Sequence, residues 1–516
     1  MNRYLKIGVI LLFVTTVTRL LGFIRETIIA ANFGASGVTD AFFIAVSIPN
    51  IIFTTISTTL GVIIVPTLTK ISVRNPILFN QYSSFFFFLL LGIVFLISSI
   101  GIFLSPIIVN SLFNNLKYPE LAIMLTALYF PCLIPMTLNH YFSSFLQVKK
   151  ILIIPTLTQL LSNLVVVATA IYFSKTVGIK AVIVGTLIGL LLQTLILFGF
   201  SRNSDFKLSV KGKLGNIRDF LNEDIKKIAP ILITTFVIQL NLLMDRFLGS
   251  FLTEGSISSL SYAFKINDFI TGVIITAFGA ILYPDFAELH QKNKIEDLKK
   301  LVFGSVRVIF LVTIPLVLGT IVYSEEIVRI LFGYGNFDVD DITSTALCLL
   351  CYTLAIPFLI LTSVLSRYYY AIEDIKTVLF NSLYYTVLNI VLSISLVNYL
   401  GARGIALAFS ISSFVGAVML LIKSHRRLAL FNLPELAKFL IKVMSAAIIM
   451  VGLLYCFKTF VNINEIVEMG IGVFIGLGLY ILFTLLLKVS DAQLLVKTLV
   501  NRGKKKQENV LEKMTS

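Results

Sequence analysis

The chain has 516 residues, of which 57% are hydrophobic and 13% are charged, and its mean hydropathy is +0.95. This composition excludes a soluble globular domain and indicates an integral membrane protein. The formal charge of +15 is spread over many short connections rather than gathered in one stripe or nucleic-acid motif, so we expect no nucleic-acid partner.

Fourteen apolar segments are long enough to cross a bilayer as helices, which takes about 20 residues each. Their length and their lack of alternation exclude barrel strands. The sequence therefore predicts an all-α integral membrane protein with fourteen transmembrane helices. The segments cover roughly residues 7–32, 38–69, 82–112, 120–147, 152–174, 178–200, 228–252, 257–289, 301–323, 342–371, 377–400, 403–423, 436–460 and 466–487.

Four charged residues interrupt the apolar stretch from Ile7 to Pro66, namely Arg19, Arg25, Glu26 and Asp40. A charge inside a bilayer is costly unless a water-filled cavity or a partner receives it, so these residues are functional candidates. Two structural alternatives stay open. Arg25 and Glu26 could form an intramembrane ion pair, and Asp40 could cap the start of a helix.

Lys and Arg residues gather in every second connection between the segments, for example at Lys149 and Lys150 and throughout 202–227. Because cytoplasmic loops are enriched in Lys and Arg, this pattern predicts that these connections are cytoplasmic. An even number of spans then places both termini in the cytoplasm.

An internal repeat organises the chain. A shift of 218 residues aligns the second segment with the eighth without a gap, and it equates Gly37 with Gly255 and Pro66 with Pro284. The offset contains an even number of spans, which predicts two parallel six-helix lobes, an architecture of transporters. We expect an N-lobe at 1–201, a cytoplasmic linker at 202–227, a C-lobe at 228–424, two C-terminal helices at 425–488 and a basic cytoplasmic tail at 489–516.

An ordered set of residues has the spacing of a known signature. It comprises Arg19, Gly22, Phe23, Arg25, Phe33, Gly34, Asp40-Ala41-Phe42-Phe43, Pro49-Asn50, Gly61 and Val65-Pro66. A second set comprises Leu331-Phe332, Gly335, Phe337, Tyr370-Ala371, Asp374, Lys376 and Thr377. Together they resemble the lipid II flippases, the MurJ or MviN family of the multidrug/oligosaccharidyl-lipid/polysaccharide exporter superfamily.

The resemblance implies a transporter of the bacterial inner membrane with a cationic cavity between two lobes. It implies that Arg19, Arg25, Asp40 and Lys265 bind a lipid-linked diphosphate glycan, because fixed cations offset the desolvation of the phosphate charges. A local alternative for Lys265 is an ion pair with Asp268, three residues further along the same helix.

The family's coupling-ion site, carried over to this sequence, falls on Asp245, Asn389 and Ser393. The family has a second carboxylate where this chain has Ser393, so we expect weak sodium binding and coupling to membrane potential or protons. Asp245 could instead be neutralised by its neighbour Arg246. Phe53-Thr54 is a further departure, because the family often carries arginine just after the Pro-Asn pair of the second segment.

The resemblance implies translocation of the peptidoglycan precursor lipid II from the cytoplasmic to the periplasmic leaflet by alternating access. The alternatives are a flippase for another undecaprenyl-linked glycan, such as an O-antigen or capsule unit, and a drug or cation antiporter of the same superfamily. We expect no enzyme activity, no cofactor and no metal site. The expected partners are the lipid-linked substrate, membrane lipids and other cell-wall synthesis proteins.

Overall fold

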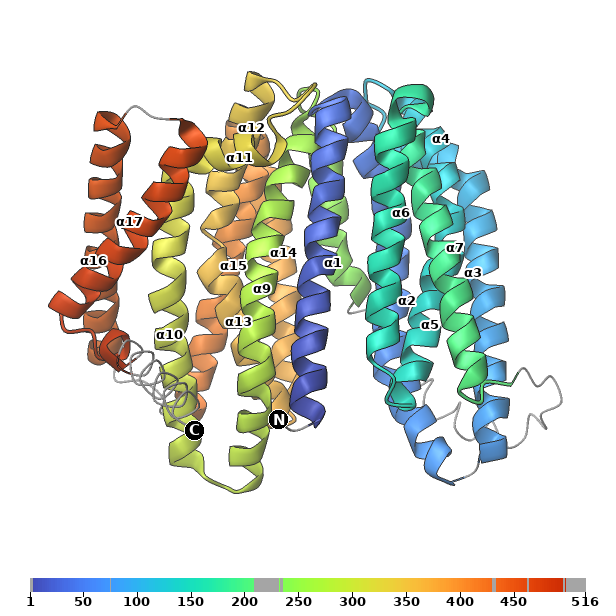
Figure 1. Ribbon diagram of the computed structural model, residues 1–516, viewed down its shortest axis with the longest axis horizontal. Coiled ribbons are helices and arrows are strands. Elements are labelled where there is room, and N and C mark those ends of the chain that lie inside the picture. Colours follow the sequence, from blue (N-terminus) through green and yellow to red (C-terminus); the bar gives the residue numbers. More distant parts are fainter. Residues whose placement is uncertain are drawn as a thin grey trace, which may run out of the picture. The chain divides into compact units, whose positions relative to one another are not determined.

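The computed structural model describes residues 3–74, 76–207, 232, 235–428, 433–461, 464–494 and 497. Within these ranges all regular elements are helices (Figure 1), which confirms the all-α membrane prediction. In the described part of the chain, eleven helices are long and apolar enough to cross a membrane, or twelve spans if one bent pair counts as a single span. With α1 and the helical residues 235–249, which match the first and seventh predicted segments, the described helices are consistent with fourteen spans.

The chain divides into two compact units, of which the first holds Met1–Lys265, Leu331–Thr345 and Thr386–Ala408. Residues 235–249 form a helix of this unit. Its other elements include α1 (Arg3–Phe33), α2 (Gly37–Arg74), α3 (Pro76–Leu112), α4 (Pro119–Tyr129), the 3-10 turn η1 (Phe130–Cys132), α5 (Leu133–Val148), α6 (Ile153–Val177), α7 (Lys180–Asn203) and the beginning of α9 (Ser256–Gln291).

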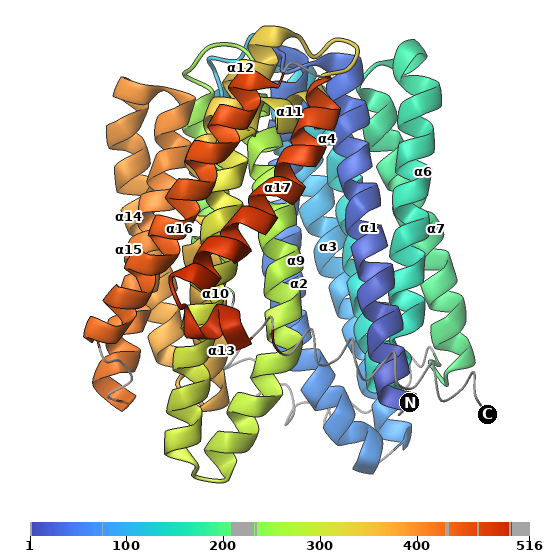
Figure 2. The same ribbon diagram turned by 60° about the vertical axis from the view of Figure 1, so that its left-hand side comes forward.

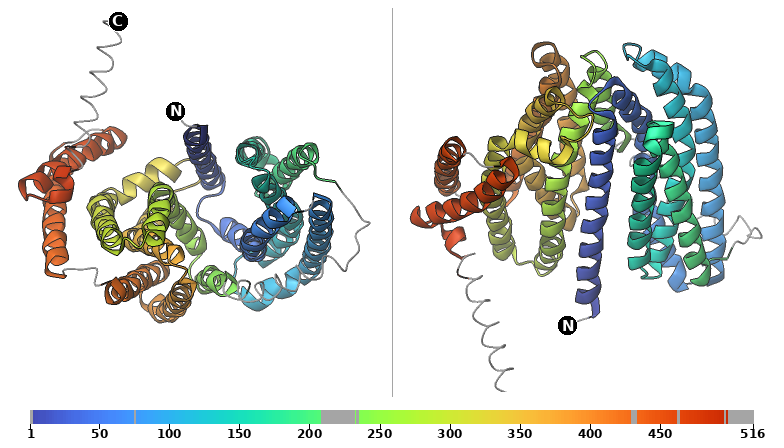
Figure 3. Two further views of the ribbon diagram at one scale, coloured as in Figure 1. Left: turned by 90° about the horizontal axis from the view of Figure 1, so that it is seen from below. Right: turned by 45° about the horizontal axis from the view of Figure 1, so that its top comes forward.

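Small residues let α6 and α7 pack closely in the first unit, where the two helices lie side by side in teal and green (Figure 3). A Cβ atom at Gly189 would lie 2.7 Å from the backbone oxygen of Ser162. This close approach is typical of helix pairs in membranes, where packing rather than hydrophobic burial drives association.

Aromatic side chains fill the core of the first unit. Phe206 is 2% exposed, and its ring centroid lies 5.2 Å from that of Phe145 and 5.7 Å from that of Phe142. Tyr141 is fully buried and donates a hydrogen bond to the backbone oxygen of Ser83. This core fixes α5 against α3 and against α7.

The second unit holds Ile266–Ile330, Ala346–Tyr385 and Phe409–Ser516. Figure 2 shows its helices from another side. They are the remainder of α9, α10 (Ile295–Val322), most of α11 (Ser324–Phe332), parts of α12 (Val339–Thr353), α14 (Ile375–Leu400) and α15 (Ala402–Leu428), and the whole of α13 (Ile356–Ala371), α16 (Leu433–Phe460) and α17 (Glu465–Leu486).

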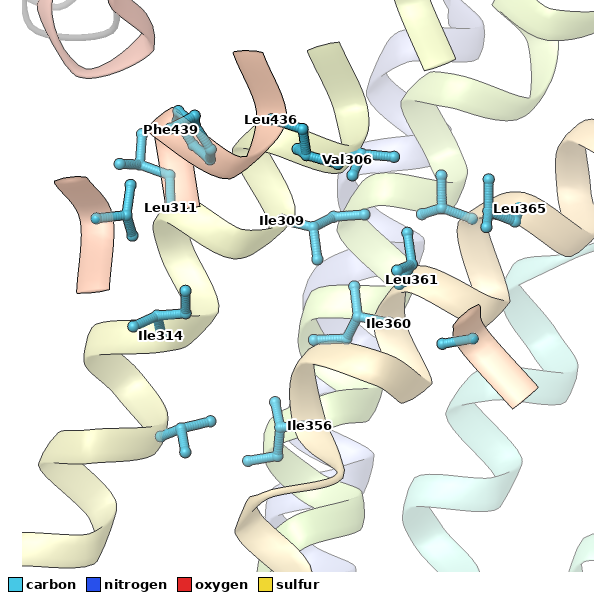
Figure 4. Packing of buried hydrophobic residues seen from close by; sticks show 14 of the residues in the cluster. Val306, Ile309, Leu311, Ile314, Ile356, Ile360, Leu361, Leu365, Leu436 and Phe439 are labelled. Carbon is cyan, nitrogen blue, oxygen red and sulfur yellow. The ribbon is translucent and has the colours of Figure 1, made fainter. Parts of the chain in front are cut away.

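An aliphatic core holds the second unit together (Figure 4). Ile309 on α10 and Ile360 on α13 are fully buried in it, and Phe439 on α16 is 4% exposed. Removal of an aliphatic side chain from water into such a core stabilises the fold by about 1.5–3 kcal/mol. On the outer faces of the helices the side chains meet lipid instead of water.

Two local features differ from the predicted segments. The segment predicted at 342–371 consists of α12 and α13, which are bent by 41° at a short break. Pro357 in the first turn of α13 explains the break, because a proline has no N–H to donate to the carbonyl four residues earlier, that of Thr353, and its ring crowds that carbonyl. The short helix α11 was not predicted at all.

The predicted lobe boundaries stay a prediction. Most of the predicted linker at 202–227 and most of the predicted tail at 489–516 lie outside the described residues.

Candidate functional site

Helix α1 carries three charged residues into the apolar part of the first unit. Glu26 is 3% exposed, whereas Arg19 and Arg25 are half-buried. Arg19 and Glu26 are seven residues apart, so they share one face of α1 at a separation of about 10 Å along its axis. Helix α6 supports this stretch, because the side-chain amide of Asn163 donates to the backbone oxygen of Thr18.

Glu26 is the centre of an ion cluster. Its Oε1 atom lies 2.6 Å from Nη2 of Arg25 and 3.8 Å from Nζ of Lys265 on α9. Its Oε2 atom and Nε of Arg25 are buried without a hydrogen-bond partner in the described part of the chain. The ion pair between Arg25 and Glu26 that the sequence left open is therefore present, and Lys265 joins it.

Arg246 is a further buried cation that the sequence analysis did not place in the site. It is 9% exposed, and its Nη1 atom donates to the backbone oxygen of Ile257 and to the hydroxyl of Ser261 on α9. Its guanidinium lies 5.6 Å from the ring centroid of Phe43 on α2, a distance at which cation–π attraction operates. Its position beside Asp245 had suggested only local neutralisation.

Asp40 caps the beginning of α9. Its carboxylate accepts hydrogen bonds from the backbone N–H groups of Gly255 at 2.8 Å and Ser258 at 2.7 Å, and from the hydroxyl of Ser258 at 2.5 Å. These N–H groups have no partner within their own helix, and the positive end of the helix dipole favours the carboxylate. This is the capping alternative, although across two helices rather than within α2. A role for Asp40 in substrate binding stays a prediction.

A second carboxylate, that of Glu254 just before α9, caps the beginning of α2 in return. Oε1 of Glu254 accepts a hydrogen bond of 2.9 Å from the backbone N–H of Gly37, the first residue of α2. Its other oxygen lies 2.5 Å from Nζ of Lys117, and this hydrogen bond lowers the pKa of Glu254 below its usual range. The beginnings of α2 and α9 are thus capped reciprocally.

The connection after α11 closes over the end of α1. The backbone N–H of Asn336 donates to the backbone oxygen of Ala31 at 2.9 Å, and the side-chain amide of Asn336 donates to the backbone oxygen of Asn32. Gly335 has φ of 63°, and a Cβ atom there would lie 2.2 Å from the oxygen of Ala31. Glycine is therefore required both for the backbone conformation and for the close approach.

Aromatic rings complete this end of the first unit. The ring of Phe332 lies 4.9 Å from that of Tyr262 and 5.4 Å from that of Phe23. Tyr262 also contacts Phe43 at 5.4 Å between centroids. Several residues of the two motif sets therefore meet in one cluster.

The predicted coupling-ion residues lie on two helices of the first unit. Asn389 and Ser393 on α14 are buried, and the hydroxyl of Ser393 donates to Oδ1 of Asn389 at 3.2 Å. Asp245 lies half-buried on the helix 235–249. One turn before it, the side-chain amide of Asn241 lies 3.5 Å from the hydroxyl of Thr386, so this helix meets α14 at that level.

The Asn389 amide nitrogen is buried without a hydrogen-bond partner among the residues described. No group of three His, Cys, Asp or Glu side chains in those residues could hold a metal ion. The use of Asp245, Asn389 and Ser393 for a coupling ion stays a prediction.

Comparison with known proteins decides the family. A family model described as lipid II flippase MurJ matches residues 29–464. The chain belongs to the MurJ family. A probable lipid II flippase MurJ of Thermotoga maritima is 27% identical over 93% of this chain and 96% of its own length. The lipid II flippase MurJ of Burkholderia cenocepacia is 25% identical over 86% of this chain and 87% of its own length.

Solved structures agree with the MurJ assignment. A lipid II flippase MurJ in an inward closed conformation matches with a TM-score of 0.80 at 25% identity, over 92% of this chain and 98% of that one. A multidrug resistance MATE transporter of the MOP superfamily matches with a TM-score of 0.67 at 16% identity, over 80% of this chain and 94% of that one. The second likeness shows the shared fold alone. The protein is therefore a multi-pass membrane protein of a transporter family.

Proposed function

We propose that this protein is a flippase that moves lipid II, a lipid-linked diphosphate glycan, from the cytoplasmic to the periplasmic leaflet of the inner membrane. Family membership supports the substrate, and the ion cluster around Glu26 is the structural observation that carries the proposal. Transport proceeds by alternating access and involves no covalent chemistry or enzymatic turnover.

The charge of the cluster suits a diphosphate. Arg25, Arg246 and Lys265 supply three positive charges, and Glu26 and Asp40 supply two negative charges. A substrate diphosphate competes with Glu26 for Arg25 and Lys265, since both cations remain partly exposed. Arg25 can engage phosphate through two donors at once, whereas Lys265 acts as a point charge.

The remaining sites follow the same scheme. Arg19 lies on the face of α1 that carries Glu26, about two turns away. We therefore assign Arg19 to the binding of the same substrate. The hydrogen bonds of Asp40 and Glu254 support a closed state at one end of the first unit, and their release belongs to the transport cycle. Asp245, Asn389 and Ser393 form the proposed coupling site.

The topology that we propose has both termini in the cytoplasm, with an N-lobe at 1–201 and a C-lobe at 228–424. The basic connections support this orientation, because Lys and Arg near helix ends are retained on the cytoplasmic side. Other cell-wall synthesis proteins are proposed partners, since they make and consume the lipid-linked substrate.

Complementation tests the proposal. A bacterial strain depleted of its own lipid II flippase should grow when it expresses the unmodified protein, and Arg19→Ala or Arg25→Ala should abolish this growth. Arg202→Ala is a matched control, because Arg202 is exposed in the last turn of α7. All variants must reach the membrane at equal levels. Growth with Arg25→Ala at the wild-type level would show that the cation cluster does not carry the substrate.

A second candidate is a flippase for another undecaprenyl-linked glycan. Phe53 favours it, because an aromatic ring that lies 6.4 Å from the ring of His140 replaces a cation at this position. If the unmodified protein fails to support the depleted strain but restores the export of an O-antigen or capsule unit, this alternative replaces lipid II.

A further inference from the structure

One face of α13 in the second unit is polar, although the helix belongs to a predicted membrane span. The apolar face packs in the aliphatic core, where its residues are at most 2% exposed (Figure 4); they are Leu361, Val364, Leu365 and Tyr368. The opposite face is half-buried to exposed, and it consists of Ser363, Ser366, Arg367 and Tyr370. These four residues follow the i, i+3, i+4 and i+7 pattern of one helix face. A charged face within a span indicates contact with water or a polar ligand rather than with lipid tails.

Arg367 is the one charged residue of α13, and it reaches across to α9. Its Nη1 atom donates to the backbone oxygen of Ile275 at 3.2 Å. Gly279, one turn further along α9, leaves room for the side chain, because a Cβ atom there would overlap the guanidinium. Among the residues that the structure describes, no carboxylate pairs with Arg367. A guanidinium has five N–H donors, so most of them remain available to a ligand.

Two structural roles do not account for this charge. An arginine near a helix end commonly extends toward the headgroups, and Arg367 is four residues from the end of α13. Its guanidinium instead lies against Ile275, which is 16 residues, or roughly 24 Å, before the end of α9. A brace for α9 is the second role, but the oxygen of Ile275 is already an acceptor of the helix itself. A neutral donor would serve as a brace equally well.

The first unit has a related arrangement at the position that the internal repeat predicts. The offset of 218 residues equates Gly279 with Gly61 on α2. A Cβ atom at Gly61 would lie 3.7 Å from Cε1 of His140 on α5, and Nδ1 of His140 is buried without a hydrogen-bond partner in the described residues. In each unit a glycine thus makes room for a basic side chain from a later helix of the same unit. This recurrence supports a role that the two repeats share.

Helix α9 also relates Arg367 to the ion cluster. Along this helix Ile275 follows Lys265 by ten residues, or roughly 15 Å, which is about half of the hydrocarbon core of a bilayer. The end of α9 is on the predicted cytoplasmic side, because Lys292 and Lys294 follow it. Arg367 therefore contacts α9 closer to the leaflet from which the substrate is taken.

We propose that Arg367 binds the diphosphate of the lipid-linked substrate as it enters from the cytoplasmic leaflet, at a loading position before the ion cluster. This role rests on the proposed function and adds a stage to it. The guanidinium can engage two phosphate oxygens at once, since its donors form a planar fork. The hydroxyls of Ser363, Ser366 and Tyr370 donate to further phosphate or sugar oxygens.

Two pairs of variants test this position from both helices. Arg367→Gln removes the charge, and Arg426→Gln is its control, because Arg426 is exposed in the last turn of α15. Gly279→Ala displaces the guanidinium from the side of α9. Its control is Gly304→Ala, because a Cβ atom at Gly304 meets nothing within 4 Å. Arg367→Lys keeps the charge but loses the fork, so it separates charge from geometry.

The experiment is photocrosslinking of the full-length protein in proteoliposomes. The crosslinking amino acid p-benzoylphenylalanine replaces Tyr370, which is 44% exposed, or Tyr384 on α14 as a position away from this face. The probe is undecaprenyl diphosphate, and undecaprenol, which has no phosphate, is the comparison. Position 370 should form an adduct with the diphosphate and position 384 should not. Arg367→Gln and Gly279→Ala should lower the yield about tenfold, as the loss of one charge-assisted hydrogen bond implies, whereas Arg367→Lys and both controls should stay within about threefold.

The outcomes separate the loading position from its alternatives. Arg25→Ala should retain the adduct, because loading precedes the ion cluster. An unchanged yield with Arg367→Gln, an equal yield with undecaprenol, or loss of the adduct with Arg25→Ala would each overturn the proposal. Undecaprenyl diphosphate carries no glycan, so the expected adducts together with failed complementation would refute the lipid II function and keep the loading position.

Discussion

Replacement of Asp40 by Asn should destabilise the protein, because the carboxylate of Asp40 is the cap of α9. In the structure it accepts three hydrogen bonds, from the N–H groups of Gly255 and Ser258 and from the hydroxyl of Ser258. An asparagine has one oxygen and one NH₂ group at the same positions. The oxygen can keep Ser258, but the NH₂ group then faces the N–H of Gly255, which also needs an acceptor.

The expected loss in the free energy of unfolding follows from these contacts. A hydrogen bond to a charged group contributes about 1.5–3 kcal/mol, and a buried N–H without a partner costs about 1–3 kcal/mol. Since Asn is itself a good capping residue and part of the site relaxes, we expect a loss of about 2–4 kcal/mol for Asp40→Asn. We expect about 3–5 kcal/mol for Asp40→Ala, which keeps no acceptor.

Thermal unfolding in detergent measures this loss. The chain has no tryptophan, but the thiol of Cys132 is buried in the same unit as Asp40, so a thiol-reactive dye reports unfolding. Asp40→Asn should lower the melting temperature by roughly 3–6 °C. Asp285→Asn, at an exposed position of α9, is the control. If Asp40→Asn melts within about 1 °C of the unmodified protein, the capping argument is refuted.

Three further predictions concern the charges of the first unit. Lys265→Arg should sustain growth in the complementation assay and Lys265→Glu should not, because the site needs positive charge; a functional Glu variant would contradict this. Glu26→Gln should destabilise the protein by about 2–3 kcal/mol, since Arg25 and Lys265 then lose their buried partner, and an unchanged melting temperature would exclude a structural role for the pair. In proteoliposomes, the rate of flipping should depend on an imposed membrane potential, worth about 2.3 kcal/mol per charge per 100 mV, or on a proton gradient, more than on a sodium gradient. The variant Ser393→Asp should introduce sodium dependence. Strong sodium dependence of the unmodified protein would refute this assignment.

The membrane helices could be predicted from the sequence because an apolar run of 20 residues has few alternatives in a bilayer. Apolar runs do not reveal local breaks. The bend between α12 and α13 depends on one proline, Pro357, within a continuous apolar stretch. The short helix α11 has charged residues in both its first and last turns, so composition alone did not distinguish it from a loop.

The candidate site could be predicted in part. The intramembrane charges Arg25, Glu26 and Asp40 stood out in the sequence because such charges need partners, and the structure provides partners for all three. Arg246 was not predicted as a member because an adjacent carboxylate, Asp245, offered a sufficient local explanation. The sequence neighbour of a buried charge is thus a weaker guide than the helix that packs against it, which here is α9.

The internal repeat accounts for the contact between the beginnings of α2 and α9. Asp40 and Ser258 are separated by 218 residues, the offset that aligns the two repeats, and they bond directly to each other. Gly37 and Gly255 are likewise equivalent, and each is capped by an acidic residue from the other repeat. Equivalent positions meet in this way where two parallel repeats approach their symmetry axis. At such a contact two aspartates would repel each other, so the pairing of a carboxylate with a hydroxyl requires the two repeats to differ at this position.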